Sequence, residues 1–373
     1  MALRSLEARA LEIPYRVAFR PSPSERRSTR SLWVTARDGD GLRGDGEGCP
    51  REPVTGESIA TALAFVMDHR AAWKAQVTGI ESLREWLHVH RPQVDRNPAA
   101  WCAVELALLD LFGKRAGVPV ETLVGSPPPQ GRFRYSAVIG ETSEGAFDAQ
   151  LRQYLQAGFR AIKIRLSGDF GRDAVKVAAL ERAGVASRLV RADAHNLWRD
   201  PREAIGYLRK LEFPFAAIEE PLALRDFAGM REVSRALEAR VILDESLVKC
   251  VDFEPIREDP NRWVANVRVS KMGGLLRALE CVEAARAAGV AVIVGAHVGE
   301  TSLLTRAGLA LGAFARDVLL AQEGALGTHL LERDITEPSL AYGTGGELDA
   351  GALARQPGLG LAISGASHAT RGE

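Results

Sequence analysis

Apolar residues in the second part of the chain recur in short runs that are rich in β-branched side chains. Eight such runs begin 24 to 29 residues apart, and amphipathic helical stretches lie between most of them. Units of this kind predict a closed parallel (β/α) barrel over residues 129–341. A doubly wound sheet is the alternative, but no glycine-rich dinucleotide motif follows the first run. The runs begin at Arg134, Ala161, Val190, Ala216, Arg240, Ala265, Val290 and Val318.

A different pattern precedes the barrel. Ser31 to Ala36 has the composition of a strand, and helical spacing predicts helices over Glu57–Lys74 and Ala99–Ala116. The second helix is apolar on most sides, so we expect it to be buried. Three consecutive prolines then break the chain, which predicts an N-terminal α+β domain over residues 1–128. The glycine-rich segment 342–373 is expected to pack back on that domain.

Composition narrows the class of partner. Lys plus Arg and Asp plus Glu number 48 each, so no excess charge favours nucleic acid or an anionic membrane. No run approaches the roughly 18 apolar residues of a membrane span, and the N-terminus lacks the apolar core of a signal peptide. Four scattered cysteines without C-x-x-C spacing indicate reduced thiols rather than zinc ligands or disulfides. We therefore expect a cytoplasmic protein with a small-molecule partner.

Ionisable residues gather where the apolar runs end. In a parallel barrel the carboxyl ends of all strands lie on one rim, which is where barrel enzymes carry their active sites. The sequence therefore predicts an active site at this rim. The residues at these ends are Lys163, Arg165, Asp193, His195, Glu219, Glu220, Asp244, Glu245, Lys271, His297 and Glu323.

Three of these residues are acids on adjacent strands. Asp193, Glu219 and Asp244 are separated by 26 and 25 residues, and neighbouring strands lie about 5 Å apart, so the three carboxylates can share one ion. A donor set made only of oxygen suits Mg²⁺ better than Zn²⁺. Each acid could instead cap the helix that follows it, but three acids in the same register favour the metal.

The basic residues indicate how a substrate proton could be handled. Lys271 is expected to end the sixth strand at the rim, where nearby cations would lower its pKa and make it a usable base. An ordinary surface lysine is the alternative. Lys163 and Arg165 are two residues apart and face the same side of their strand. Arg165 stays protonated, so it suits a carboxylate or a developing negative charge.

The histidines and the last acid leave alternatives open. His195 follows a predicted metal ligand by two residues, so it could transfer a proton or serve as a structural donor. His297 could bind substrate or only pack, and Glu323 could bind substrate or pair with a lysine. Glu220 and Glu245 adjoin predicted ligands and are expected either to support those ligands from behind or to be ion-pair partners. A divalent ion, a lysine and fixed cations together suit removal of the weakly acidic proton beside a carboxylate.

In order and spacing, these motifs resemble the enolase superfamily, in its mandelate racemase and muconate lactonizing enzyme branch. The resemblance implies a modified TIM barrel under an N-terminal capping domain, with Mg²⁺ held by Asp193, Glu219 and Asp244. It also implies a loop, over Phe19–Arg30, that covers the substrate, and a homo-oligomer. The motifs are the helix AAWCAVELALLDLFGK, KIR at Lys163, DAHNLW at Asp193, IEEP at Ile218, LDES at Leu243 and KMGG at Lys271.

Departures from the family pattern shape the expected reaction. Lactonizing relatives carry a catalytic lysine where this chain has Arg165, and many relatives carry an asparagine where it has His195. We expect an isomerase of the cycloisomerase or racemase kind that acts on a small carboxylic acid. The alternatives are a dehydratase, in which His195 helps to expel hydroxide, and an impaired barrel that only binds metal and carboxylate. The expected catalytic residues are Lys271, Lys163, Arg165 and His195, and the expected substrate-binding residues are His297 and Glu323.

Overall fold

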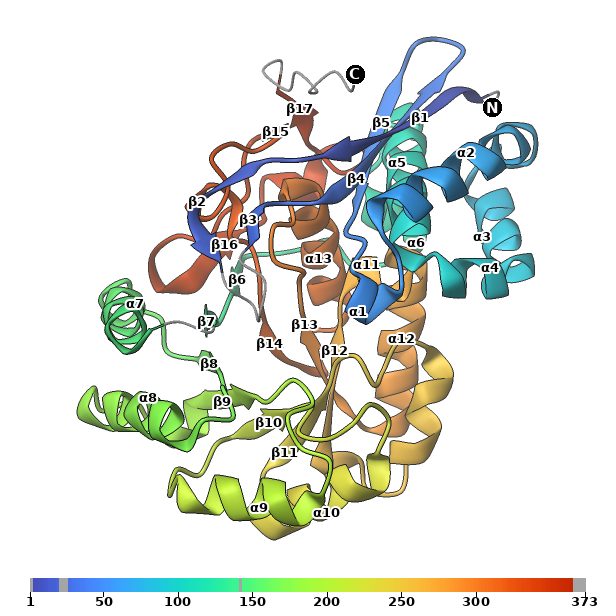
Figure 1. Ribbon diagram of the computed structural model, residues 1–373. Coiled ribbons are helices and arrows are strands. Elements are labelled where there is room, and N and C mark those ends of the chain that lie inside the picture. The colour runs from blue at the N-terminus through green and yellow to red at the C-terminus, as the bar shows by residue number, and fades with distance from the viewer. Residues whose placement is uncertain (1–2, 20–25, 141–142, 365–373) are drawn as a thin grey trace.

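The second part of the chain forms a barrel. The computed structural model describes residues 3–19, 26–140 and 143–364, and in it eight parallel strands form one sheet in sequence order (Figure 1). A parallel bridge between Tyr135 and Gln322 joins the two edges, so the sheet curls round as predicted. The strands are β7 (Ala137–Ile139), β8 (Ile162–Arg165), β9 (Val190–Asp193), β10 (Ala217–Glu219), β11 (Arg240–Leu243), β12 (Trp263–Val267), β13 (Ala291–Val294) and β14 (Leu319–Gln322).

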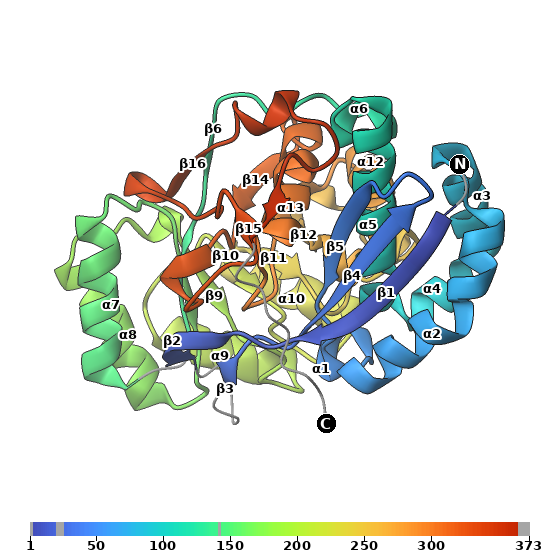
Figure 2. The same ribbon diagram turned by 90° about the horizontal axis from the view of Figure 1, so that it is seen from above.

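Helices connect these strands and cover the outer face of the barrel. Every strand begins within three residues of the run that predicted it. Seen from above, α7 and α8 lie on one side of the molecule and helices of the N-terminal part on the opposite side (Figure 2). The helices are α7 (Glu144–Gln156), α8 (Phe170–Arg182), α9 (Pro201–Lys210), α10 (Phe227–Leu237), α11 (Val269–Met272), α12 (Leu275–Ala288) and α13 (Ser302–Phe314).

Alternation along the strands separates an apolar layer from a polar one inside the barrel. Side chains two residues apart in a strand point to the same face. Ala217, Ile242 and Val264 belong to a small apolar cluster inside the sheet. Two residues further along the same strands are Glu219, Asp244 and Asn266, all buried. The alternation of side chains that places apolar residues inside the barrel therefore also places a ring of polar side chains at its rim.

The N-terminal part of the chain packs a sheet on a buried helix. The glycines at 44, 46 and 48 in β5 lie against α5, where an added Cβ would overlap the carbonyl oxygens of Ala107, Ala103 and Ala99 in turn. Glycines at every second position of β5 and alanines at every fourth position of α5 thus allow the strand and the helix to pack closely. The elements are antiparallel β1 (Leu3–Leu11), β4 (Ser31–Asp38) and β5 (Arg43–Gly48), the pair β2 (Pro14–Phe19) and β3 (Arg26–Ser28), and helices α1 (Glu52–Thr55), α2 (Ile59–Gln76), α3 (Ile80–Val89), α4 (Arg91–Arg96), α5 (Pro98–Ala116) and α6 (Val120–Val124).

The N-terminal part is bound to the barrel beside its rim. Arg51 donates to the carbonyl of Val298 at 3.0 Å, and Thr29 donates to that of Gly299 at 2.7 Å. Both carbonyls belong to the loop that follows β13. The covering loop expected over Phe19–Arg30 includes residues 20–25, which lie outside the described residues, so its role stays a prediction.

The C-terminal segment returns to the N-terminal helices. The backbone of Gly358 accepts from Val120 N and donates to the Val118 carbonyl, each at 2.9 Å. The division of the chain at residue 128 stays a prediction. Among the described residues, no helix is long and apolar enough to cross a membrane.

Candidate active site

The three predicted metal ligands lie at the same rim. Arg165 and Asp193 are direct partners in the β8–β9 ladder, and Asp193 and Glu219 are direct partners in the β9–β10 ladder. Asp244 follows the last residue of β11. Parallel register therefore brings together carboxylates that are about 25 residues apart in sequence.

Lys163 directs its ammonium group into this acidic cluster. Its Nζ lies 2.6 Å from Glu219 Oε2, 3.3 Å from Glu323 Oε2 and 3.4 Å from Asp193 Oδ2. Burial alone would lower the pKa of Lys163, but these three carboxylates together raise it above its usual value. Lys163 is therefore a fixed positive charge at neutral pH.

Arg268 is a rim residue that the sequence analysis missed. It follows the last residue of β12, and its guanidinium forms an ion pair with Asp244 Oδ2 and lies 3.9 Å from Glu219 Oε1. Burial alone would raise the pKa of Asp244, but Arg268 and then Lys271 hold it well below its usual range. The alternation of Val264, Asn266 and Arg268 along β12 and beyond it is the pattern that points to this residue.

Lys271 does not end the sixth strand, so that expectation was wrong. β12 ends at Val267, and Lys271 lies in the short helix α11 with its side chain fully buried. Its Nζ lies 2.6 Å from the Asp244 carbonyl, 2.7 Å from the Asn266 carbonyl and 2.9 Å from Asp244 Oδ1. Three acceptors use all three protons of an ammonium group, so in this structure Lys271 is held beside Asp244.

The donor set fits a magnesium ion by its chemistry. Glu219 Oε2 is buried without a hydrogen bond, although the Lys163 ammonium lies 2.6 Å away. Burial, together with the charges of neighbouring acids, raises the pKa of Glu219 to about 8. Among the described residues, no three acidic, His or Cys side chains are arranged as a closed metal site, because Lys163 and Arg268 lie between the acids. Binding of an ion by Asp193, Glu219 and Asp244 therefore requires these two cations to release them.

His195 lies at the exposed side of the cluster. Its side chain is 42% exposed, and its Nδ1 lies 3.8 Å from Glu245 Oε1. Burial and then the charge of Arg165 lower the pKa of His195, so its ring is uncharged near neutral pH. Arg165 NH1 lies 3.7 Å from Asp193 Oδ2. The structure thus places an uncharged imidazole beside two of the predicted site residues.

His297 presents a buried ring nitrogen to the barrel interior. Its Nδ1 lies 3.3 Å from Arg268 NH1, and its Nε2 has no hydrogen-bond partner among the described residues. Because the arginine can only donate, Nδ1 is the acceptor, and Nε2 of the neutral ring carries the proton. Glu300 accepts the backbone N–H of His297 at 2.6 Å, which fixes this loop. His297 can therefore donate a hydrogen bond.

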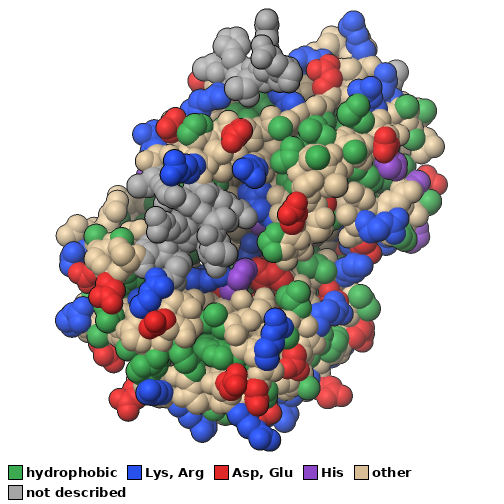
Figure 3. Space-filling view, viewed as in Figure 1, with side chains coloured by type: hydrophobic (Ala, Val, Ile, Leu, Met, Phe, Trp, Pro, Cys, Tyr) green, Lys and Arg blue, Asp and Glu red, His purple; other side chains and the backbone are tan. Residues whose placement is uncertain are grey.

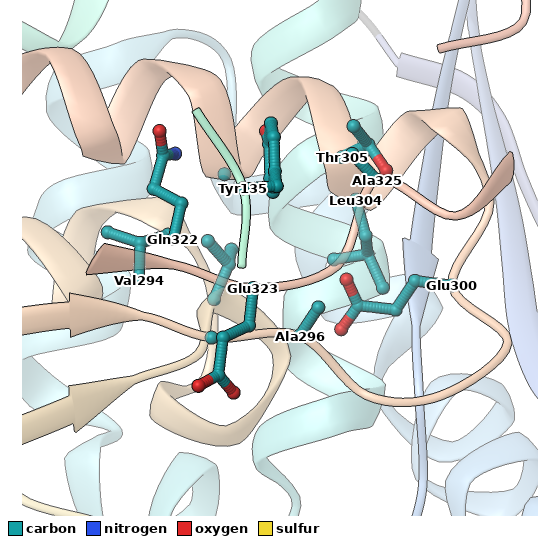
Figure 4. A pocket seen from close by; sticks show the side chains of 12 residues that line it. Tyr135, Val294, Ala296, Glu300, Leu304, Thr305, Gln322, Glu323 and Ala325 are labelled. Atoms are coloured by element: carbon teal, nitrogen blue, oxygen red, sulfur yellow. The ribbon is translucent and has the colours of Figure 1, made fainter. Parts of the chain in front are cut away.

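The last strand supplies Glu323. Its Oε1 accepts a hydrogen bond from Arg191 at 2.9 Å, and its Oε2 faces Lys163. Of the two roles expected from the sequence, substrate binding and pairing with a lysine, the structure shows the second. Glu323 and Glu300 line the same small pocket, and the neighbouring Gln322 points in the opposite direction from Glu323 (Figure 4).

Glu220 supports the loop that carries Asp244. It accepts from the backbone N–H of Asp244 at 2.7 Å and from that of Ser246 at 2.8 Å. Of the two expected roles, Glu220 therefore has that of supporting a predicted ligand and not that of an ion-pair partner. On the outer surface, basic, acidic and histidine side chains meet in the hollow between the N-terminal part and the barrel (Figure 3).

Comparisons with known proteins match nearly the entire chain. The chain is 27% identical to L-Ala-D/L-Glu epimerase of Bacillus subtilis, with 97% of each chain covered. It is 23% identical to N-succinyl-L-Arg/Lys racemase of Bacillus cereus, which covers 98% of this chain and 96% of the racemase. A crystal structure of dipeptide epimerase from Methylococcus capsulatus, complexed with Mg and the dipeptide L-Arg-D-Lys, superposes with a TM-score of 0.83. That pair is 26% identical and covers 98% of this chain and all of the epimerase.

These relatives confirm the barrel fold and the isomerase class expected from the sequence, and they do not favour the dehydratase or impaired-barrel alternatives. The family model described as enolase C-terminal domain-like matches residues 146–367, which is more than half of the chain. With its charged rim and its barrel, this chain belongs to the enolase superfamily, in the mandelate racemase and muconate lactonizing enzyme branch.

Proposed function

We propose that this chain is a magnesium-dependent epimerase or racemase that acts at the carbon beside a substrate carboxylate. The observation that carries the proposal is the meeting of Asp193, Glu219 and Asp244 with the cations Lys163 and Arg268 on one rim. Carboxylate oxygens hold a hard divalent ion, and fixed positive charges stabilise the negative charge that develops when the proton leaves. The epimerases and racemases among the relatives support this reaction class.

Each acid and each cation then has a separate role. Asp193, Glu219 and Asp244 hold the ion, which supplies a Lewis acid for the substrate carboxylate. Lys163, Arg165 and Arg268 stabilise the negative charge that develops on the substrate, and they keep their own protons at neutral pH. Lys271 acts as a positioning residue, because two of its three hydrogen bonds fix the backbone and side chain of Asp244 and the third holds the Asn266 carbonyl.

His195 is the residue that we assign to proton transfer. Among the described rim residues, the ammonium groups of Lys163 and Lys271 each face three oxygen atoms, and arginine does not act as a base. The imidazole of His195 is partly exposed and uncharged, so it can accept the proton from one face of the carbon, and water delivers a proton to the opposite face to complete the inversion. His297 donates its Nε2 proton to a substrate oxygen.

The substrate that we propose is a dipeptide or an N-acyl amino acid with a second carboxylate. Dipeptides and N-succinyl amino acids are the molecules in the names of the relatives. Arg165 and Arg268 remain charged at the rim, and guanidinium groups bind carboxylates well. We also propose that the protein is cytoplasmic, which is consistent with its four free thiols. We further propose that it is a homo-oligomer, which analytical sedimentation would test.

Isotope exchange tests the proposal. The protein is incubated with Mg²⁺ in D₂O and with L-Ala-L-Glu, N-succinyl-L-Lys or the matched amide L-Ala-L-Gln, and the carbon beside the carboxylate is followed by NMR. We expect deuterium uptake with inversion, its loss in EDTA, and kcat/KM at least about tenfold higher for the glutamyl dipeptide than for the amide. Formation of a keto acid from a sugar acid or hydroxy acid, supplied in a separate incubation, would instead identify a dehydratase. Absence of exchange with every acid, in protein shown to bind Mg²⁺, would overturn the proposed reaction. Equal rates for L-Ala-L-Glu and L-Ala-L-Gln would overturn only the proposal that the enzyme recognises a second carboxylate.

A further inference from the structure

Two cysteines far apart in the sequence lie in contact at the edge of the barrel. The Sγ atoms of Cys250 and Cys281 are 3.1 Å apart. Cys250 begins a short 3-10 helix in the segment after β11, and Cys281 lies in the middle of α12. Since a disulfide bond is about 2 Å long, an approach of roughly 1 Å would join the two sulfur atoms.

The two thiols differ in access and in acidity. Cys250 is only partly buried, whereas Cys281 is 2% exposed. The hydrogen bond from Cys281 lowers the pKa of Cys250, and the same contact raises the pKa of Cys281. An accessible thiol with a lowered pKa attacks external sulfur, and a buried neighbour can then complete the bond.

The other two cysteines lack such a partner sulfur. Cys49 lies 3.2 Å from Ser31 Oγ, and Cys102 lies 3.5 Å from the Glu47 carbonyl. Both are buried, and burial raises the pKa of each thiol. They serve as internal controls for the reactivity of the pair.

We propose that Cys250 and Cys281 are a modification site that a small external disulfide oxidises to a protein disulfide. The thiolate of Cys250 attacks one sulfur of the external disulfide and releases the first thiolate. Cys281 then loses its proton and attacks Cys250 Sγ, which releases the second thiolate. Two protein thiols are oxidised, and one external disulfide is reduced to two thiols.

The crosslink would tie the segment that follows β11 to α12, beside the N-terminal part of the chain. The bond closes a loop between residues 31 positions apart, and Arg268 and Lys271 lie within this loop. The neighbours of both cysteines already converge on α4, because Asp95 lies 3.1 Å from Lys249 Nζ and 2.6 Å from an Arg277 nitrogen. Oxidation would therefore restrain the segment on which Arg268 is carried.

Thiol titration and peptide mapping test the inference on the reduced full-length protein treated with oxidised glutathione. We expect two of the four thiols to be lost, a mass decrease of about 2 Da, and a peptide that links the segments around Cys250 and Cys281. The melting temperature should rise by about 4 °C, as expected for closing a loop of this length in a chain of this size, and dithiothreitol should reverse the rise.

Variants assign the two steps. Cys281→Ser should stop at a stable glutathione adduct on Cys250, and Cys250→Ser should leave Cys281 unreacted. Cys102→Ser is the matched control and should form the crosslink as the unmodified chain does. Four titratable thiols after oxidation, or a crosslink that persists in Cys250→Ser, would overturn the inference.

Discussion

Replacing Arg268 with alanine is expected to tighten magnesium binding. The guanidinium forms an ion pair with Asp244 and lies 3.9 Å from Glu219, so it engages two of the three proposed ligands. A hydrogen bond to a charged group contributes about 1.5–3 kcal/mol. Binding of the ion must replace this interaction, and its loss in Arg268→Ala should lower Kd by about 10- to 100-fold, at 1.4 kcal/mol per factor of ten.

Calorimetric titration of the metal-free protein with MgCl₂ measures this effect directly. Arg191→Ala is the matched control, because Arg191 is also buried and pairs at 2.9 Å with Glu323, which is not one of the three proposed ligands. We expect Arg191→Ala to change Kd by less than about threefold. An unchanged or weaker Kd in Arg268→Ala would refute the competition between guanidinium and ion. Equal tightening in both variants would show that general charge repulsion is responsible.

Three further outcomes are expected. His195→Asn should lower deuterium exchange by at least about 100-fold with little change in KM, whereas normal exchange would remove His195 from proton transfer. Lys271→Met removes one of the two cations that pair with Asp244, so the free energy of unfolding in urea should fall by about 1.5–3 kcal/mol; a variant of normal stability that has lost exchange would instead make Lys271 a proton carrier. Burial raises the pKa of Glu47 to about 7 from 4.5, so the folded protein binds this proton more tightly than the unfolded chain does. Its contribution to stability is complete below pH 4.5 and is lost as the pH rises to 7, by up to roughly 3 kcal/mol. Glu47→Gln should flatten this slope in pH-dependent unfolding, and an unchanged slope would assign it to other groups.

The barrel and the position of its three acids at the rim could be predicted because both follow from short-range periodicity. Strand runs at constant spacing fix the order of a parallel sheet, and the position of each acid after its run fixes its place at the rim. The positions of Asp193, Glu219 and Asp244 could therefore be predicted without any knowledge of side-chain geometry.

The sixth strand shows where this reasoning fails. The run ANVRVSK keeps β-branched residues beyond Val267, and composition alone extends the strand to Lys271. The chain turns into α11 two residues after β12 ends, which buries Lys271 and leaves Arg268 at the rim. A turn of this kind depends on tertiary packing and on Gly273 and Gly274, both with positive φ, and not on the pattern of the strand.

The pairing of charges at the rim links the stability of the fold to its chemistry. Each of the three acids faces at least one cation. Lys163 lies 2.6 Å from Glu219 and 3.4 Å from Asp193, and Arg165 lies 3.7 Å from Asp193. Asp244 pairs with both Arg268 and Lys271. A cluster of buried carboxylates is costly without countercharge, so these cations stabilise the folded chain. A divalent ion shared by the acids would neutralise them in place of the cations. The same side chains would then be available for a second anion, the substrate, and this exchange of partners is why their substitution should change metal affinity and exchange rate in opposite directions.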